Sequence, residues 1–116
     1  MPSGAAGDWT SQVRRGVLEL CVLALLSRQP SYGYEIVATL AGWTPLAAGE
    51  NTLYPLLRRL KSDGQLETFE APSPTGPPRQ YYRLTAAGHA RLLTLQSEWS
   101  ALASAVDAYL NPGDTP

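Results

Sequence analysis

Apolar residues recur at helical spacing in four stretches of the chain, and turn-forming residues separate these stretches. The first predicted helix runs from Thr10 or Ser11, either of which can cap it, to about Ser27, and it is apolar on nearly every side. The second runs from a Ser31 cap to about Gly42. Its packing candidates are Tyr34, Val37, Ala38 and Leu40. The all-round apolarity of the first helix indicates a helix packed between neighbours.

The third predicted helix, from roughly Asn51 to Asp63, has the clearest signals. Pro55 must lie near the first turn, where a missing backbone N–H costs little, and Gly64 is a suitable residue just after the end. Leucines at i, i+3, i+4 and i+7 predict one buried stripe along this helix. They are Leu53, Leu56, Leu57 and Leu60.

Two short β-favouring segments, residues 65–70 and 79–84, flank a tip rich in Pro, Gly and Ser at residues 71–78. This pattern predicts a β-hairpin. Because proline lacks a backbone N–H, the four prolines of the tip are expected to make it stiff and to prevent regular strand pairing there. Thr85 then caps a last helix that runs to about Leu110, before the breaker at residues 111–113.

The order helix, helix, helix, hairpin, long helix predicts a mainly α fold with a small β-hairpin (α+β), a winged helix-turn-helix with a long C-terminal helix. In that arrangement the third helix enters the major groove of DNA. The predicted organisation has four parts. They are a flexible arm at residues 1–9, a winged helix-turn-helix DNA-binding domain at 10–84, a dimerisation helix at 85–110 and a disordered tail at 111–116.

The last helix carries an apolar seam with alternating spacings of three and four residues, which is a heptad pattern. Its members are Leu92, Leu95, Trp99, Leu102, Val106 and Tyr109. A long helix beside a small winged domain has no obvious partner in its own chain, so the seam predicts a homodimer with a second copy. Two alternatives stay open: the helix folds back over the first helix, or the seam packs on both the first and last helices of the partner.

Composition changes this picture little. Apolar residues make up 44% and charged residues 16% of the 116 residues, which favours one globular domain and excludes a disordered chain. The single cysteine, Cys21, excludes an internal disulfide, and its apolar neighbours predict a small buried hydrophobic residue. The net charge of −1 gives no global attraction to nucleic acid, but phosphates respond to local charge within about a Debye length, ~10 Å.

The local distribution of charged and polar residues does favour binding to DNA. With the leucine stripe facing inward, the opposite face of the third helix presents Asn51, Pro55, Arg58 and Ser62, flanked by Tyr54, Arg59 and Lys61. Arginine can pair with guanine and asparagine with adenine, whereas tyrosine, serine and lysine more often contact phosphate. The competing interpretation is an ordinary solvated helix face.

The hairpin supports the DNA interpretation. It adds Arg79 and Arg83, and no acidic residue lies between Glu70 and Glu98. Charge is therefore segregated along the chain although its sum is near zero.

Other classes of protein fit less well. The apolar run at residues 17–26 is too short to cross a bilayer and lacks a cleavage pattern, so a cytoplasmic protein without a membrane partner is expected. No nucleophile is paired with a base, and no phosphate loop or metal-ligand cluster is present in the sequence, so neither an enzyme nor a cofactor is predicted. The lone histidine, His89, reads as a surface or wing-packing residue.

Two long segments resemble the PadR family of bacterial transcriptional regulators. They are Ser31-Tyr32-Gly33-Tyr34-Glu35-Ile36 and Asn51-Thr52-Leu53-Tyr54-Pro55-Leu56-Leu57-Arg58-Arg59-Leu60-Lys61-Ser62-Asp63-Gly64. The match continues through Gly76 and residues 79–88, covers about residues 13–110, and is similar to the short-chain branch of the family. The resemblance implies a dimeric repressor on a palindromic operator. It places Tyr32, Asn51, Thr52, Tyr54, Arg58, Lys61 and Arg79 where family members approach DNA. The proline-rich tip departs from the family pattern, which leaves the contact of the wing open.

The resemblance also suggests a role for Trp99. In short PadR-like regulators that sense planar drugs, a tryptophan in this helix lines a cavity at the dimer centre, so a planar small-molecule effector is a possible partner. The plainer interpretation is an interface anchor. The alternative for the whole chain is a winged-helix protein–protein interaction module without DNA binding.

Overall fold

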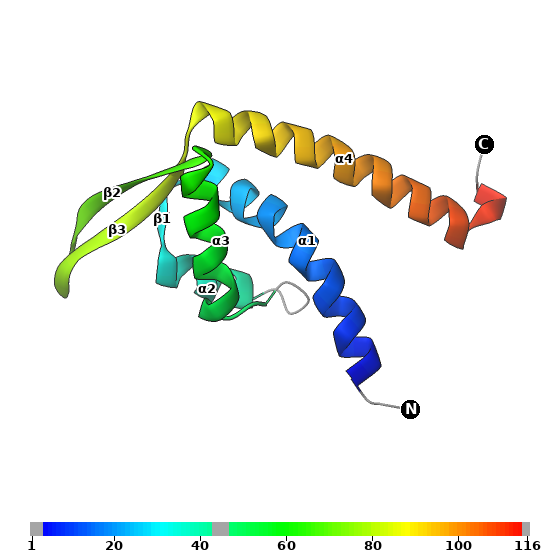
Figure 1. Ribbon diagram of the computed structural model, residues 1–116, viewed down its shortest axis with the longest axis horizontal. Helices are drawn as coiled ribbons and strands as arrows, with labels where there is room; N and C mark the ends of the chain where they lie inside the picture. The colour runs from blue at the N-terminus through cyan, green and yellow to red at the C-terminus, as the bar shows by residue number, and fades with distance from the viewer. Residues whose placement is uncertain (1–3, 43–46, 115–116) are drawn as a thin grey trace.

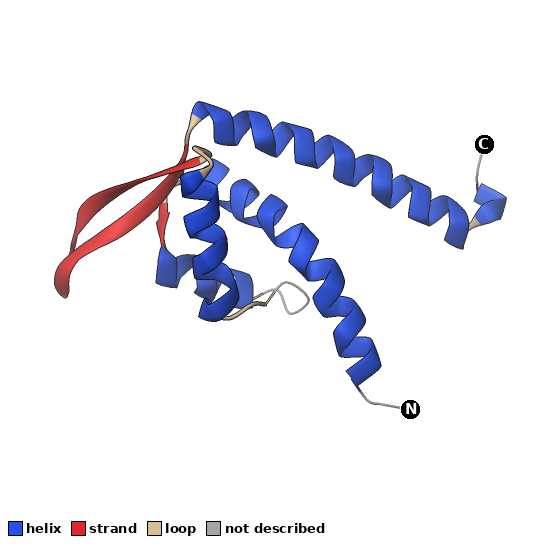
Figure 2. Ribbon diagram, viewed as in Figure 1, coloured by secondary structure: helices blue, strands red, loops and turns tan. Residues whose placement is uncertain are grey.

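The computed structural model describes residues 4–42 and 47–114, which form four helices, a three-stranded sheet and a terminal 3₁₀ turn (Figures 1 and 2). The predicted α+β winged-helix fold is confirmed. In chain order the elements are α1 (Gly4–Arg28), β1 (Ser31–Tyr32), α2 (Gly33–Ala41), α3 (Glu50–Ser62), β2 (Leu66–Ser73), β3 (Gly76–Leu84), α4 (Ala86–Leu110) and the turn Pro112–Asp114.

The sheet is antiparallel with strand order β1–β3–β2, and β2 and β3 form the predicted hairpin, the wing. The expectation that the tip lacks regular pairing is correct only in part, because pairing continues to Ser73 and Gly76. The register is irregular only between Ala71 and Ser73, around Pro72. Strand β1 pairs with β3 only at Tyr81 and Tyr82. The prolines at positions 77 and 78 of β3 therefore do not remove any hydrogen bond between β3 and β1.

The core lies between α1, α2, α3 and the inner face of the sheet. The leucine stripe of α3 is confirmed, with Leu53, Leu57 and Leu60 fully buried and Leu56 packed at its edge. The other residues of the core cluster come from α1, α2 and the strands: Leu18, Val22, Leu23, Leu26, Ile36, Leu40, Leu66, Tyr82 and Leu84. Within the described ranges, none of the helices has the length and apolarity needed to cross a membrane.

The second predicted helix needs three corrections. Ser31 does not cap it but lies in β1, paired with Tyr82, and its hydroxyl donates to Glu35 Oε1 at 2.6 Å. The predicted packing of Tyr34 and Ala38 is wrong, since both are exposed and Ile36 is buried instead. A strand of two residues is too short to leave a period in the sequence, so β1 and the later helix start were missed.

Both predicted terminal segments are also partly wrong. Helix α1 begins at Gly4, six positions before Thr10, so residues 4–9 of the expected arm are helical and residues 1–3 lie outside the described part. No proline interrupts residues 4–9, and two alanines there favour helix. In the expected disordered tail, residues 112–114 form a 3₁₀ turn, and residues 115–116 are outside the described part.

The junction of α3, the wing and α4 follows the sequence signals closely. Gly64 has φ 78°, its N–H donates to Lys61 O, and the N–H of Gln65 donates to Leu60 O, which is a Schellman ending for α3. Thr85 Oγ1 accepts from Gly88 N at 3.1 Å, as predicted for the cap of α4, and donates to Gly64 O at 2.6 Å. The two ends of the wing are therefore tied together at one point.

Candidate nucleic-acid interface

The face of α3 opposite the leucine stripe is open to solvent, as the sequence predicts. Asn51, Thr52, Arg58 and Lys61 are exposed on it, and Tyr54 is half-buried at its edge. These side chains are positioned by the buried leucines, because burial of the stripe fixes the rotation of the helix about its axis.

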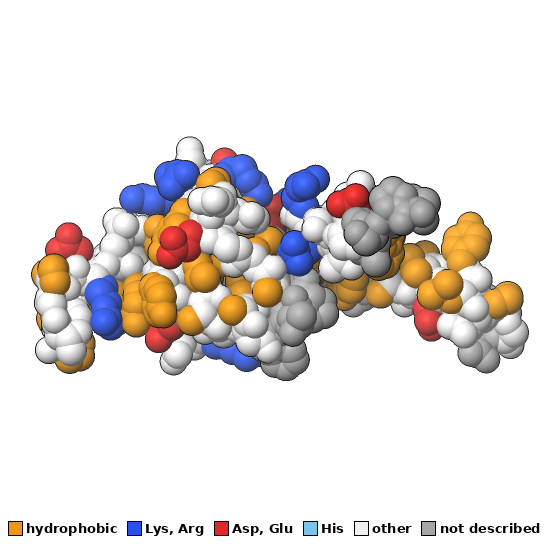
Figure 3. Space-filling view, turned by 90° about the horizontal axis from the view of Figure 1, so that it is seen from below, with side chains coloured by type: hydrophobic (Ala, Val, Ile, Leu, Met, Phe, Trp, Pro, Cys, Tyr) orange, Lys and Arg blue, Asp and Glu red, His pale blue; other side chains and the backbone are white. Residues whose placement is uncertain are grey.

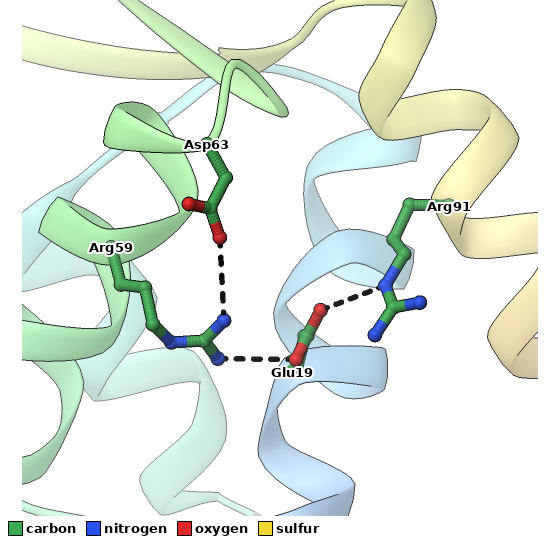
Figure 4. A network of polar contacts seen from close by, with 4 residues as sticks. All are labelled: Glu19, Arg59, Asp63 and Arg91. Atoms are coloured by element: carbon green, nitrogen blue, oxygen red, sulfur yellow. Dashed lines mark hydrogen bonds and ion pairs between the residues drawn. The ribbon is translucent and has the colours of Figure 1, made fainter.

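Arg59, adjacent to this face, is directed into an internal ion-pair network (Figure 4). Its Nη2 donates to Glu19 Oε1 of α1 at 3.1 Å, and its Nη1 lies 3.6 Å from Asp63 Oδ2. Arg91 of α4 donates from Nε to Glu19 Oε2 at 3.1 Å. Burial raises the pKa of Glu19, but the two arginines outweigh it and hold the pKa below the usual range. Glu19 therefore joins three helices as a carboxylate.

Arg83 on the wing is also paired, since its Nε donates to Glu67 Oε2 across the hairpin at 2.6 Å. Acidic and basic residues are separated along the sequence but not in the folded chain, because carboxylates of α1 and β2 form ion pairs with arginines of α3, β3 and α4. Within residues 4–42 and 47–114, the cations of α3 and the wing that lack a carboxylate partner are Arg58, Lys61 and Arg79.

Arg79, which pairs with Ala71 along the wing, is held by aromatic side chains. Its guanidinium lies over the ring of Tyr32, 4.4 Å from the centroid. Tyr32 in turn meets Tyr81 edge-on at 5.4 Å, and Tyr81 stacks on Phe69 at 5.5 Å. This row places a cation beside the start of α2 in a defined orientation, at low cost in side-chain entropy.

A hollow of about 470 Å³ opens between the start of α2, the first turns of α3 and strand β3. We call it the wing-base hollow; its lining residues are Tyr32, Gly33, Tyr34, Tyr54, Arg79, Gln80 and Tyr82. A Cβ atom on Gly33 would lie 2.5 Å from Cε1 of Tyr54, so glycine is required for the Tyr54 ring to lie against α2. The lining contains one arginine and no carboxylate, which makes it favourable for an anion.

The family model described as "Transcriptional regulator PadR-like family" matches residues 22–94, which include α2, α3 and the whole wing. The chain belongs to the PadR-like family of transcriptional regulators. This membership makes it a DNA-binding regulator.

Known proteins of similar sequence and structure agree with this membership. A PadR-like transcription factor from Bacteroides fragilis is 40% identical with a TM-score of 0.70, and the match covers 88% of this chain and 98% of that one. A PadR family regulator from Eggerthella lenta is 37% identical with a TM-score of 0.80, covering 90% and 91%. A curated relative from Lysinibacillus sphaericus, described as an uncharacterized protein, is 31% identical over 86% of this chain and 94% of its own length.

In this PadR-like chain, the apolar seam of α4 divides into two parts. Leu92 and Leu95 pack against the core cluster, beside α1. Beyond them α4 and α1 diverge (Figure 1), and the rest of the seam is exposed: Trp99 by 42%, Leu102 by 58%, Val106 by 48% and Tyr109 by 89%. Apolar side chains are seen at this free end of α4, at the right of Figure 3, with no basic side chain among them.

A second hollow, of about 440 Å³, lies between α1 and the middle of α4. Trp99, Leu95 and Leu102 contribute from α4, and Val13, Val17 and Leu20 from α1. Glu19, Arg91 and Glu98 add charge to this largely apolar lining. The part of the seam that faces α1 is therefore not fully packed within one PadR-like chain.

Sequence reasoning missed Tyr82. The signal was present, because Tyr82 and Leu84 alternate along β3 with the outward Arg79, Tyr81 and Arg83. On this strand, only Arg79 and Arg83 were singled out from the sequence, because of their charge. Tyr82 is 9% exposed, yet it lines the wing-base hollow.

Proposed function

We propose that this chain is a cytoplasmic repressor that binds a palindromic operator as a homodimer. One observation carries the proposal: Arg58, Lys61 and Arg79 have no carboxylate partner in the described ranges, and they lie on α3 and on strand β3 of the wing. Elsewhere on α3 and the wing, arginines are neutralised by Glu19, Asp63 and Glu67. Unneutralised cations beside a recognition helix suit the phosphates that border a major groove.

The exposed residues divide by chemistry. Arg58 and Asn51 are assigned to base edges, because their side chains can make two hydrogen bonds to guanine and adenine. Phosphate contacts are assigned to Tyr32, Thr52, Tyr54, Lys61 and Arg79. Arg59 was predicted to join the DNA-binding set, and its contact with Glu19 favours an indirect role, in which it orients α3 against α1.

The exposed part of the α4 seam supports the homodimer. Trp99, Leu102, Val106 and Tyr109 present apolar side chains for which the described part of the chain supplies no cover. A second copy, related by a two-fold axis, would bury both seams, with Leu92 and Leu95 continuing into each core. Two α3 helices could then read half-sites about one helical turn apart, ~34 Å.

Capture of genomic DNA tests this proposal. Fragments retained by the purified chain are sequenced, and affinity for a retained fragment is measured over a range of salt concentrations. We expect a two-fold symmetric sequence and an affinity that falls steeply with salt. The protein–protein module is favoured instead if no fragment is enriched and no duplex binds at low salt.

The repressor assignment has its own test. Transcription in vitro from the retained promoter fragment should fall as the chain is added. An increase would identify an activator that uses the same DNA contacts.

The hollow between α1 and α4 favours a second role for Trp99, as part of an effector site as well as an interface anchor. An indole in an apolar lining that also holds Glu19 and Glu98 suits a planar cationic ligand. Such a compound should quench the fluorescence of Trp99 in a chain whose other tryptophans, Trp9 and Trp43, are replaced by phenylalanine. Quenching in the wild type but not in this variant chain, whose single tryptophan is Trp99, would place the ligand elsewhere.

A further inference from the structure

Tyr82 in the wing-base hollow is an unusual core residue. It is 9% exposed and belongs to the core cluster, and it is the one member of that cluster that also lines the hollow. Its hydroxyl has no hydrogen-bond partner in the described part of the chain. Phenylalanine would fill the core equally well. Because the Tyr82 side chain is largely buried while its hydroxyl is not a buried orphan, the hydroxyl is free to donate a hydrogen bond to a molecule that enters the hollow.

The start of α2 lies in the same hollow. Helix α2 has nine residues, and its N-cap, Tyr32, is in an extended conformation and makes no side-chain cap hydrogen bond. The first amides of the helix therefore lack a side-chain acceptor, and they carry the positive end of the helix dipole. Glu35 of this first turn does not line the hollow, since its Oε1 accepts from Ser31.

Two arginines lie near Tyr82. Arg79 lines the hollow from β3, with its guanidinium over the Tyr32 ring. Burial raises the pKa of Tyr82, the neighbouring Tyr54 adds to the rise, and Arg58 lowers it in part. The phenol is thus within electrostatic reach of Arg58 on α3.

We propose that the wing-base hollow holds one backbone phosphate of the bound DNA, with the Tyr82 hydroxyl donating a hydrogen bond to a non-bridging oxygen. The α2 amides and Arg79 complete the anion site. The inference rests on the proposed DNA binding and deepens it, because it adds a positioning residue that does not belong to the outward face of α3. Tyr54 links the hollow to that helix, and about 470 Å³ accommodates a phosphate with its sugar.

Tyr82→Phe tests the hydrogen bond, because it removes only the hydroxyl and keeps the ring in the core. Affinity is measured for a duplex retained from genomic DNA and for an unrelated duplex at low salt. We expect binding about tenfold weaker for both, by the same factor, because a phosphate contact carries no sequence information. The unfolding midpoint should be unchanged or higher.

Tyr81→Phe is the matched control. Tyr81 is the adjacent residue on the opposite face of β3, stacked on Phe69 and absent from the lining of the hollow, so its variant should bind like the wild type. Arg79→Gln should also weaken both duplexes, and it should lower the salt dependence by about one charge per copy.

Three results would overturn the phosphate site: wild-type affinity in Tyr82→Phe, an equal loss in Tyr81→Phe, or a loss confined to the retained duplex. Competition by inorganic phosphate at constant ionic strength that is lost in Tyr82→Phe would support the site, because the free anion and the DNA phosphate would then exclude each other there. Failure of the proposed DNA binding itself is recognised separately, since the wild-type chain would then bind neither duplex.

Discussion

Helices α3 and α4 both carry an apolar stripe, but the described part of the chain buries only the stripe of α3 in full. Leu53, Leu57 and Leu60 of α3 are fully buried, whereas the seam of α4 is exposed from Trp99 to Tyr109. A stripe that its own chain covers fixes a helix and leaves the opposite, polar face for a ligand. A stripe that its own chain leaves open is itself a binding surface.

Charge follows the same division. α3 carries Arg58, Arg59 and Lys61, while no lysine or arginine follows Arg91 in the sequence. A polyanion would therefore be drawn to α3 and the wing, and an apolar partner to the free end of α4. The two surfaces differ enough for substitutions to affect one without the other.

Leu57→Ala, in the buried leucine stripe of α3, should have the largest effect on stability. Leu57 is fully buried, so the loss of its side chain leaves a cavity and should lower the free energy of unfolding by about 2–5 kcal/mol. Urea denaturation measures this. Leu102→Ala, in the exposed seam of α4, is the comparison: it should lower stability only at protein concentrations where the wild type forms the proposed dimer, and have little effect where both proteins are monomers. If both variants lose the same stability at every concentration, α4 is part of the monomer core.

Trp99→Asp should have the next largest effect, on association. A carboxylate near the centre of the seam must be desolvated in both copies, so we expect the dimer to weaken by about 100-fold or more. Sedimentation velocity measures this. Leu93→Asp is the control, because Leu93 is 67% exposed but lies off the seam. A dimer that survives Trp99→Asp would remove the seam from the interface.

Arg58→Ala should weaken binding to the retained operator by about 1–3 kcal/mol if Arg58 reads a base. Gel retardation at fixed salt measures this. The neighbouring Arg59→Ala should weaken binding less, because the Arg59 guanidinium already contacts Glu19 and Asp63. Equal losses in the two variants would show that the ion-pair network leaves Arg59 available to DNA.

Much of the fold could be predicted because local signals were strong. Gly64 and Thr85 mark the end of α3 and the start of α4, and each acts through its own backbone chemistry. Pro55 marks the start of α3 less closely than predicted, because it is the sixth residue of the helix and lies inside it. The start of α1 and the strand β1 could not be predicted in the same way. Neither has a cap or a period that marks it, and β1 exists only through its pairing with Tyr81 and Tyr82.

The sequence could predict which residues make up the candidate site, but it could not predict which of them form ion pairs within the chain. Helical geometry alone gives the outward positions of Asn51 and Arg58, which the structure confirms as exposed. Which arginines are neutralised depends on Glu19, separated by 40 residues from Arg59 and by 72 from Arg91. No pattern within one helix reports such a contact, so Arg58 and Arg59 looked alike in the sequence.

Glu19→Gln, the smallest expected effect, acts where the two regions meet, since Glu19 contacts Arg59 of α3 and Arg91 of α4. Because its folded pKa lies below 4.5, ionised Glu19 stabilises the fold fully above that pH, and the stabilisation is lost as pH falls through the folded pKa. Near pH 7 the variant should be less stable by about 1 kcal/mol, a modest value because both arginines are about half exposed. Urea midpoints of the two proteins should converge as the pH falls below 4.5. A difference that persists in acid would show that the Glu19 side chain acts through packing, and α3 and α4 would then not be joined by charge.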